Sequence, residues 1–159
     1  MIESNREIKK PSEKREIMPR FEASALRGYC VSVLTASGVE RSCAEAVADA
    51  LIDAELTGVS THGVSRLAVY MQRMDAGVMS RENNIRIVRE STSTLVVDDD
   101  NSLGAAAAKF AMERCIAKAK ETGCCFASVH SSNHFGTAAY YTRLAAAQDM
   151  IGFACTNLK

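Results

Sequence analysis

The chain has 159 residues, of which 47% are hydrophobic and 24% are charged, as expected of a globular protein with one domain or two small ones. Its 19 basic and 19 acidic residues cancel, and no basic stripe carries interleaved aromatic residues, so the sequence argues against a nucleic-acid partner. No apolar run is long enough to span a membrane, and the N-terminus lacks the apolar core of a signal peptide. We therefore expect no membrane partner and a cytoplasmic location.

The first half of the chain is predicted to be helical. Residues 1–19 are charged in both signs and contain two prolines, which predicts a disordered tail. A helical domain at 20–80 follows, because apolar residues recur there at helical spacing between glycines. Ser42 with Glu45 three residues later has the pattern of a capping box. In chain order, the predicted helices cover about 21–37, 42–57 and 62–75.

The second half, 81–159, alternates between strand and helix patterns, which predicts an α/β layer. The glycine signature G-x-G-x-x-G is missing, so a Rossmann fold is weakly supported. A last apolar strand at 151–155 would need a partner and covering helices, which suggests the front part of a longer protein. The other expected elements are strands at 85–88 and 94–97, a turn at 98–101, a helix at 104–120, a buried strand at 124–129, a polar turn at 131–136 and a helix at 137–148.

The stretch from Asp53 to Met74 contains the first candidate site. On a helix starting near His62, residues advance about 100° each, so one face carries polar side chains and the opposite face apolar ones. An imidazole and a guanidinium one turn apart at a helix start suit a small anionic substrate. The alternative is an amphipathic helix whose polar face is merely solvated. The polar face comprises His62, Arg66, Tyr70 and Arg73, and the apolar face Val64, Leu67, Met71 and Met74.

A second histidine motif, residues 130–136, has the sequence HSSNHFG and lies between a predicted strand and a predicted helix. Proteins of the α/β class place ligand-binding loops at such positions, and a helix start attracts anions. His134 is therefore a candidate, with a hydrogen-bonded loop residue as the alternative. His130 and His134 are four residues apart with two cysteines nearby, but no carboxylate completes a ligand set, so we predict no metal.

Three stretches carry a family resemblance: DAELTGVSTHGVSRLAVYMQRMDAG, VVDDDNSLGAAAA and SVHSSNHFGTAAYYTRLAAAQDMIGFACTN. Together, over residues 20–157, they resemble the non-Rossmann malate/L-lactate dehydrogenase family, which includes ureidoglycolate, sulfolactate and diketogulonate oxidoreductases and cyclic imino-acid reductases. The resemblance implies NAD- or NADP-dependent interconversion of a small 2-oxo acid and 2-hydroxy acid, and a homodimer. It also implies that 81–159 is an incomplete cofactor domain of the family's own non-Rossmann type.

The resemblance also implies roles for individual residues. His62 matches the histidine that gives or takes the proton, and Arg66 matches the arginine that binds the substrate carboxylate. Thr61 replaces the more usual serine but keeps the hydroxyl, and Tyr70 matches a position facing the same pocket. His134 matches a histidine near substrate and nicotinamide. The implied cofactor contacts are His134, Gly136, Thr156 and Asn157.

Relatives continue past Thr156 and Asn157 into a long remainder that supplies much of their cofactor site. The alternative to an enzyme is therefore a truncated, non-catalytic oligomerisation or binding module. The choice of substrate and the choice between NAD and NADP are left open by the sequence.

Overall fold

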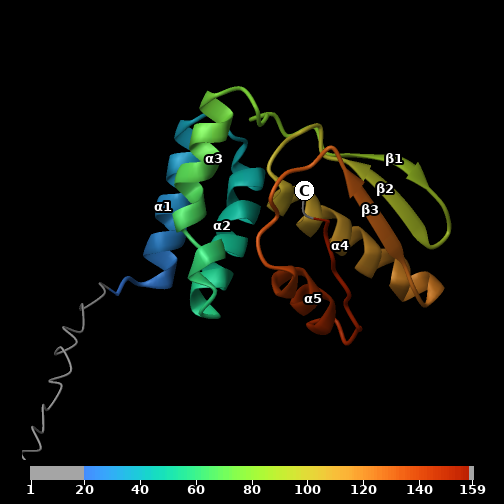
Figure 1. Cartoon of the computed structure of the whole chain (residues 1–159). Coiled ribbons are helices and arrows are strands. Elements are labelled where there is room, and N and C mark those ends of the chain that lie inside the picture. Colours follow the sequence, from blue (N-terminus) through green and yellow to red (C-terminus); the bar gives the residue numbers. More distant parts are fainter. Residues whose placement is uncertain (1–19, 158–159) are drawn as a thin grey trace, which may run out of the picture.

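The computed structural model describes residues 20–157, so the predicted tail at 1–19 lies outside the described residues. Within that range the chain forms a group of helices followed by a small sheet with two further helices (Figure 1). The predicted α/β class and the order of helices are confirmed. The elements are α1 (Ala23–Ala36), α2 (Arg41–Leu56), the short 3-10 helix η1 (Ser60–His62), α3 (Ser65–Asp75), β1 (Arg86–Glu90), β2 (Thr94–Asp98), α4 (Gly104–Thr122), β3 (Phe126–His130) and α5 (Ala138–Ala146).

Helix α2 is the centre of the packing. It contacts α1 as well as α4 and α5, so it is buried on several sides. Alanine occupies many of these positions, and its small side chain allows neighbouring helices to approach closely. The buried cluster thus includes residues of both halves of the chain; the predicted boundary between domains near residue 80 stays a prediction. The buried residues of α2 are Cys43, Ala44, Ala46, Val47, Ala48, Ala50, Leu51, Ile52 and Ala54.

The sheet has the strand order β1-β2-β3. Strands β1 and β2 are antiparallel, and β2 and β3 are parallel, with Asp98 opposite His130 at the last pair of the register. Helix α4 makes the crossover from β2 to β3 and packs along both strands (Figure 1). Leu95 and Val97 of β2 are at most 2% exposed. The loops after β2 and β3 consequently lie side by side at one end of the sheet.

Two predictions about helix starts are wrong. The N-cap of α2 is Glu40, and Ser42 donates its hydroxyl proton to the Glu40 carboxylate at 2.6 Å, so the capping box does not form. Helix α3 begins at Ser65 and not near His62. The cause is Glu55, whose carboxylate accepts the N–H of Val64 at 2.8 Å. A Cβ at Gly63 would lie 2.1 Å from that carboxylate, so only glycine lets the side chain cross the chain there.

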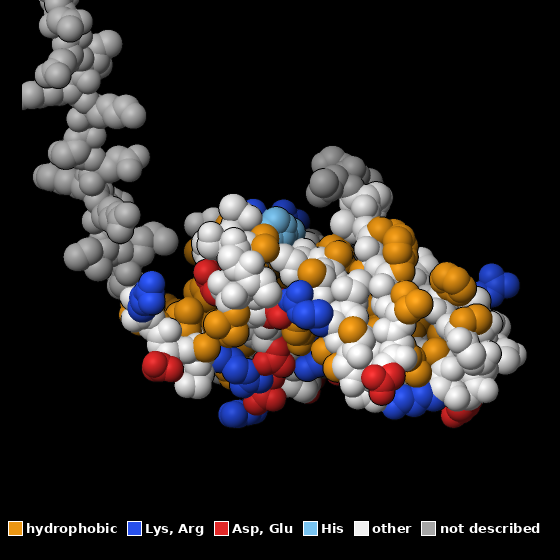
Figure 2. Space-filling view, turned by 90° about the horizontal axis from the view of Figure 1, so that it is seen from below, with side chains coloured by type: hydrophobic (Ala, Val, Ile, Leu, Met, Phe, Trp, Pro, Cys, Tyr) orange, Lys and Arg blue, Asp and Glu red, His pale blue; other side chains and the backbone are white. Residues whose placement is uncertain are grey.

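Two predicted strands also differ from the structure. The expected buried strand at 124–129 begins only at Phe126, and most of β3 is exposed because it forms the sheet edge among residues 20–157. The expected strand at 151–155 forms no ladder with any described residue. Its inward positions pack, with Gly152 against Thr142 of α5. Its outward positions, Ile151 and Phe153, are 102% and 79% exposed. In the view of Figure 2, hydrophobic side chains are visible at the surface toward both the left and the right of the molecule.

Candidate active site

The two histidine motifs meet in the folded chain. His62 lies at the end of η1, and His134 lies in the loop between β3 and α5. Their ring centroids are 5.2 Å apart and the ring planes are inclined by 30°, which is a stacked arrangement. Each ring is therefore held against the other, although they come from opposite halves of the chain.

Thr61, His62 and Arg66 form one hydrogen-bonded unit. The Thr61 hydroxyl lies 3.0 Å from Nδ1 of His62, so Nε2 is the ring nitrogen left without a partner among residues 20–157. The Arg66 Nε–H donates to the Thr61 carbonyl at 2.6 Å. The Thr61 carbonyl thus fixes the orientation of the Arg66 guanidinium. No hydrogen bond is found from the two terminal guanidinium nitrogens to another described residue. The unit presents a ring nitrogen and a pair of cationic donors from adjacent positions.

Helical phasing placed Tyr70 on the polar face with His62 and Arg66, with a solvated face as the alternative, and the structure buries Tyr70. It is 2% exposed, and its hydroxyl lies 2.8 Å from Nδ1 of His134. Burial raises the pKa of Tyr70 to about 12, so the hydroxyl keeps its proton. Among the described residues, His134 Nδ1 is the acceptor within its reach. Donation by Tyr70 puts the ring proton of neutral His134 on Nε2.

The electrostatics around His134 favour its neutral form. Partial burial of the ring lowers its pKa from 6.5, and the positive charges of Arg66 and of protonated His62 lower the pKa further. Neutral His134 can present an N–H donor without adding a second positive charge beside Arg66. The structure thus gives the two histidines different surroundings, with a hydroxyl from η1 on one and a buried phenol from α3 on the other.

The loop that carries His134 is bound by residues of the loop after β2, which the sequence analysis did not identify as part of the site. The Asp99 N–H donates to the His130 carbonyl at 3.1 Å, and the Asn101 N–H donates to the Ser131 carbonyl at 2.7 Å. These bonds extend the β2–β3 pairing into the loops. Ser132 donates its hydroxyl proton to the Asp99 carboxylate at 2.7 Å. The sequence indicated only a turn at 98–101, yet Asp98 ends β2 and Asp99 is 0% exposed.

Gly104 sets the closeness of this loop to α4. A Cβ at Gly104 would lie 2.2 Å from the Asn133 carbonyl oxygen, so Gly104→Ala must push the loop away from the helix start. We expect a loss of about 1–3 kcal/mol in the free energy of unfolding, measured by urea titration. The matched control is Gly28→Ala in α1, which meets nothing within 4 Å and should stabilise the helix by roughly 0.5–1 kcal/mol. Equal stabilities of the two variants would contradict this steric account.

Comparison with known proteins identifies the family. Residues 21–159 match the family described as malate/L-lactate dehydrogenase. The chain belongs to this family. The L-sulfolactate dehydrogenase of Methanocaldococcus jannaschii is 41% identical over 127 residues, which cover 80% of this chain and 37% of that protein. The malate dehydrogenase of Pyrococcus horikoshii is 39% identical, over 87% of this chain and 38% of that protein.

Solved structures of the malate/L-lactate dehydrogenase family have the same fold. The Pyrococcus horikoshii OT3 malate dehydrogenase structure matches with a TM-score of 0.79 and 38% identity over 82% of this chain and 37% of that chain. The Methanocaldococcus jannaschii sulfolactate dehydrogenase structure matches with a TM-score of 0.78 and 37% identity, over 80% of this chain and 37% of that chain. This chain thus spans less than two fifths of the length of these relatives.

The remaining candidate residues of this family member are only partly brought together. Gly136 adopts φ +83°, a backbone conformation that favours glycine, two residues before α5 begins. Thr156 and Asn157 are exposed, and the hydrogen bond found for their side chains runs from the Thr156 hydroxyl to the Asn157 carbonyl at 3.3 Å. Within residues 20–157, no hydrogen bond connects these two residues to the histidine pair.

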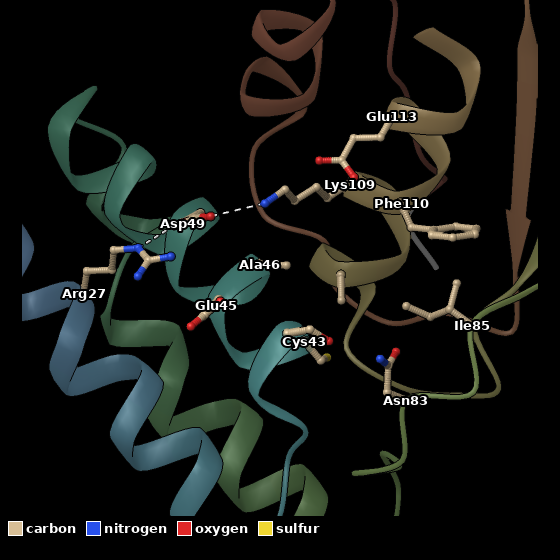
Figure 3. A pocket seen from close by; sticks show the side chains of 12 residues that line it. Arg27, Cys43, Glu45, Ala46, Asp49, Asn83, Ile85, Lys109, Phe110 and Glu113 are labelled. Atoms are coloured by element: carbon tan, nitrogen blue, oxygen red, sulfur yellow. Dashed lines mark hydrogen bonds and ion pairs between the residues drawn. The ribbon is translucent and has the colours of Figure 1, made fainter. Parts of the chain in front are cut away.

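Two other polar features lie apart from the histidine pair. His130 Nδ1 lies 3.7 Å from the Asp98 carboxylate, and no group of three potential ligand side chains that could hold a metal ion occurs within residues 20–157. A cavity of about 580 Å³ lies between α2 and α4. There Asp49 binds both Arg27, at 2.6 Å, and Lys109, at 3.3 Å, which connects α1, α2 and α4 (Figure 3).

No helix in the described part of the chain is long and apolar enough to cross a membrane.

Proposed function

We propose that this chain forms the substrate-binding and proton-transfer part of an NAD- or NADP-dependent oxidoreductase that interconverts a small 2-oxo acid and its 2-hydroxy acid. The observation that carries the proposal is the convergence of Thr61, His62 and Arg66 beside His134. Membership of the malate/L-lactate dehydrogenase family supports it. A homodimer and a cytoplasmic location are parts of the same proposal.

Arg66 is the group that binds the substrate carboxylate. Its Nε is already engaged by the Thr61 carbonyl, so the guanidinium is fixed before substrate arrives. The two terminal nitrogens can then donate parallel bonds to the two carboxylate oxygens, which defines the orientation of the acid. Lysine would keep the charge but lose this planar pair of donors. Malate and sulfolactate, the substrates named for two relatives, both carry such a carboxylate next to the hydroxyl carbon.

His62 is the acid/base. The chemistry that NAD or NADP supplies when bound is hydride transfer at the carbon between carboxylate and oxygen. In the reducing direction, His62 donates the Nε2 proton to the substrate oxygen as negative charge grows there, and in the oxidising direction it removes that proton. The Thr61 hydroxyl at Nδ1 holds the ring orientation during both transfers.

The residues around His134 fit a nicotinamide cofactor in their chemistry. Neutral His134 offers an Nε2–H donor, and the space beside Gly136 is open, since even an added Cβ would meet nothing within 4 Å. The Thr137 hydroxyl at the start of α5 is buried without a partner in the described chain, so it is available as a further polar contact. Thr156 and Asn157 complete the proposed set.

The proposal is tested by binding and turnover with the full chain. NADH and NADPH are titrated separately by fluorescence, and oxaloacetate or 3-sulfopyruvate is then added to the complex. Saturable binding followed by cofactor oxidation supports the enzyme. Saturable binding without oxidation by a range of 2-oxo acids supports the alternative, a non-catalytic binding module. That alternative is motivated by the share of the relatives that the chain spans and by the exposed apolar residues Ile151 and Phe153. Absence of any cofactor binding overturns the enzyme and supports the other form of the alternative, a non-catalytic oligomerisation module.

A further inference from the structure

Helix α3 contacts the loop between β3 and α5 that carries His134, here called the histidine loop, through two adjacent turns. Tyr70 reaches His134, as described above, and Arg73 donates from Nη2 to the side-chain carbonyl oxygen of Asn133 at 3.1 Å. Residues three apart on a helix lie on the same face, so α3 meets two consecutive loop residues with two consecutive turns. The phasing of the sequence had placed Arg73 on the face of His62 and Arg66, but the structure gives it a different partner.

Asn133 is bound from the opposite side by the loop that follows β2. Its side-chain N–H groups donate to the Ser102 carbonyl at 2.8 Å, the Asn101 carbonyl at 3.0 Å and the Asn101 side-chain oxygen at 3.1 Å. The amide oxygen faces Arg73 and the amide nitrogen faces the sheet half of the chain. One side chain therefore connects α3 to the β2–α4 loop, immediately before His134.

The segment after His134 is also held. The Tyr141 hydroxyl donates to the Phe135 carbonyl, and the two rings stack with centroids 5.2 Å apart. His134 thus lies between two fixed neighbours, and the position of its ring follows from both. The Phe135 side is anchored by Tyr141 of α5, whereas the Asn133 side is bound both by the loop after β2 and by Arg73 of α3.

We propose that Arg73 is a positioning residue that acts through Asn133 to fix His134 against His62 and Tyr70. Arg73 is exposed, and the hydrogen bond found for its side chain goes to Asn133, so its proposed effect on His134 is indirect. Asn133 suits this position because a carboxamide accepts on one side and donates on the other. Aspartate would accept from Arg73 but would oppose the carbonyl groups of Asn101 and Ser102. The inference rests on the proposed role of His134 in the substrate pocket.

The test follows His134 directly in the full chain by ¹⁵N NMR of its imidazole, which is tractable because the sequence has three histidines. In the parent protein we expect one neutral tautomer, protonated on Nε2. In Arg73→Met we expect mixed tautomers and a His134 pKa that rises toward 6.5.

Four variants separate positioning from charge and from general destabilisation. Asn133→Ala keeps the Arg73 charge, so it should reproduce the changes at His134 only if the hydrogen-bonded connection matters. The double variant should add little to either single one. Arg73→Lys keeps the charge and one possible donor, and should restore part of the parent tautomer signal. Arg41→Met, an exposed helix arginine bound to Glu45, is the matched control and should leave His134 unchanged.

An unchanged His134 tautomer and pKa in folded Arg73→Met would overturn the proposal, because this exposed substitution leaves the core intact. A change in Arg73→Met but not in Asn133→Ala would also overturn it, since charge alone would then explain the effect. These readouts need neither cofactor nor turnover. Failure of the proposed dehydrogenase activity is therefore distinguishable from failure of the positioning role.

Discussion

Replacing His62 by alanine is expected to lower kcat for 2-oxo acid reduction by about 10²–10⁴-fold, which is the usual contribution of a positioned acid/base. In the proposed assignment Arg66 holds the substrate carboxylate, so KM should change far less. Cofactor affinity should also change little, because the proposed role of His62 is proton transfer and not cofactor contact. Stopped-flow or steady-state measurement of NADH or NADPH oxidation, with fluorescence titration of the cofactor, separates these effects.

Two variants sharpen this result. Thr61→Val removes the hydroxyl at His62 Nδ1 with little change in volume, so it should lower kcat by less than His62→Ala does. His130→Ala is the matched histidine control, because His130 is exposed and lies beside Asp98 outside the site. Turnover by His62→Ala equal to that of His130→Ala would contradict the acid/base assignment.

The sequence predicted those parts of the site that depend on neighbours in the chain. The spacing of His62 and Arg66 indicated that they act together, and the structure joins them through Thr61. The structure places His62 at the end of η1 before α3, which begins three residues later than the pattern indicated. The reason is Glu55, a residue of the previous helix, which interrupts the backbone at Gly63. A contact of this kind has no signature in helical periodicity.

The contacts that bring the two motifs together could not be predicted from spacing. Tyr70 looked like a member of a polar face, but the fold buries it and directs its hydroxyl to His134, 64 positions away. Arg73 and Asn133 are 60 positions apart. Their pairing depends on how α3 lies against the loop after β3, and single-sequence patterns carry no information on that packing. Burial was misjudged for the same reason at 124–129, since a sheet edge and a sheet interior share one apolar pattern.

Ionisation of Asp99 is expected to lower the stability of the folded chain as the pH rises. Asp99 is 0% exposed, and burial raises its pKa from 3.8 to about 6, while the bond from Ser132 partly opposes that rise. Unfolding returns the carboxyl to water and to its ordinary pKa. Between about pH 4 and pH 6 the folded chain therefore binds more protons than the unfolded chain.

The free energy of unfolding should consequently fall across that interval and level off above it, by about 3 kcal/mol for the full shift. Urea titrations from pH 4 to pH 8 measure the curve. In Asp99→Asn the residue cannot ionise, so the fall specific to Asp99 should vanish, whatever constant cost the buried amide adds. Asp149→Asn, at an exposed aspartate, is the matched control and should keep the parent slope. A parallel slope in Asp99→Asn would contradict the assignment.

Ser132→Ala connects this titration to the histidine loop. The Ser132 hydroxyl stabilises ionised Asp99, so its removal should destabilise the chain by about 1.5–3 kcal/mol above pH 6 and by less near pH 4, where the carboxyl is protonated. The same loss frees the loop two residues before His134. The amides of Asp99 and Asn101, which donate to the His130 and Ser131 carbonyls, should therefore exchange faster in Ser132→Ala at pH 8 than at pH 5, after correction for the intrinsic rate. Equal protection at both pH values would show that Asp99 and the histidine loop are not coupled.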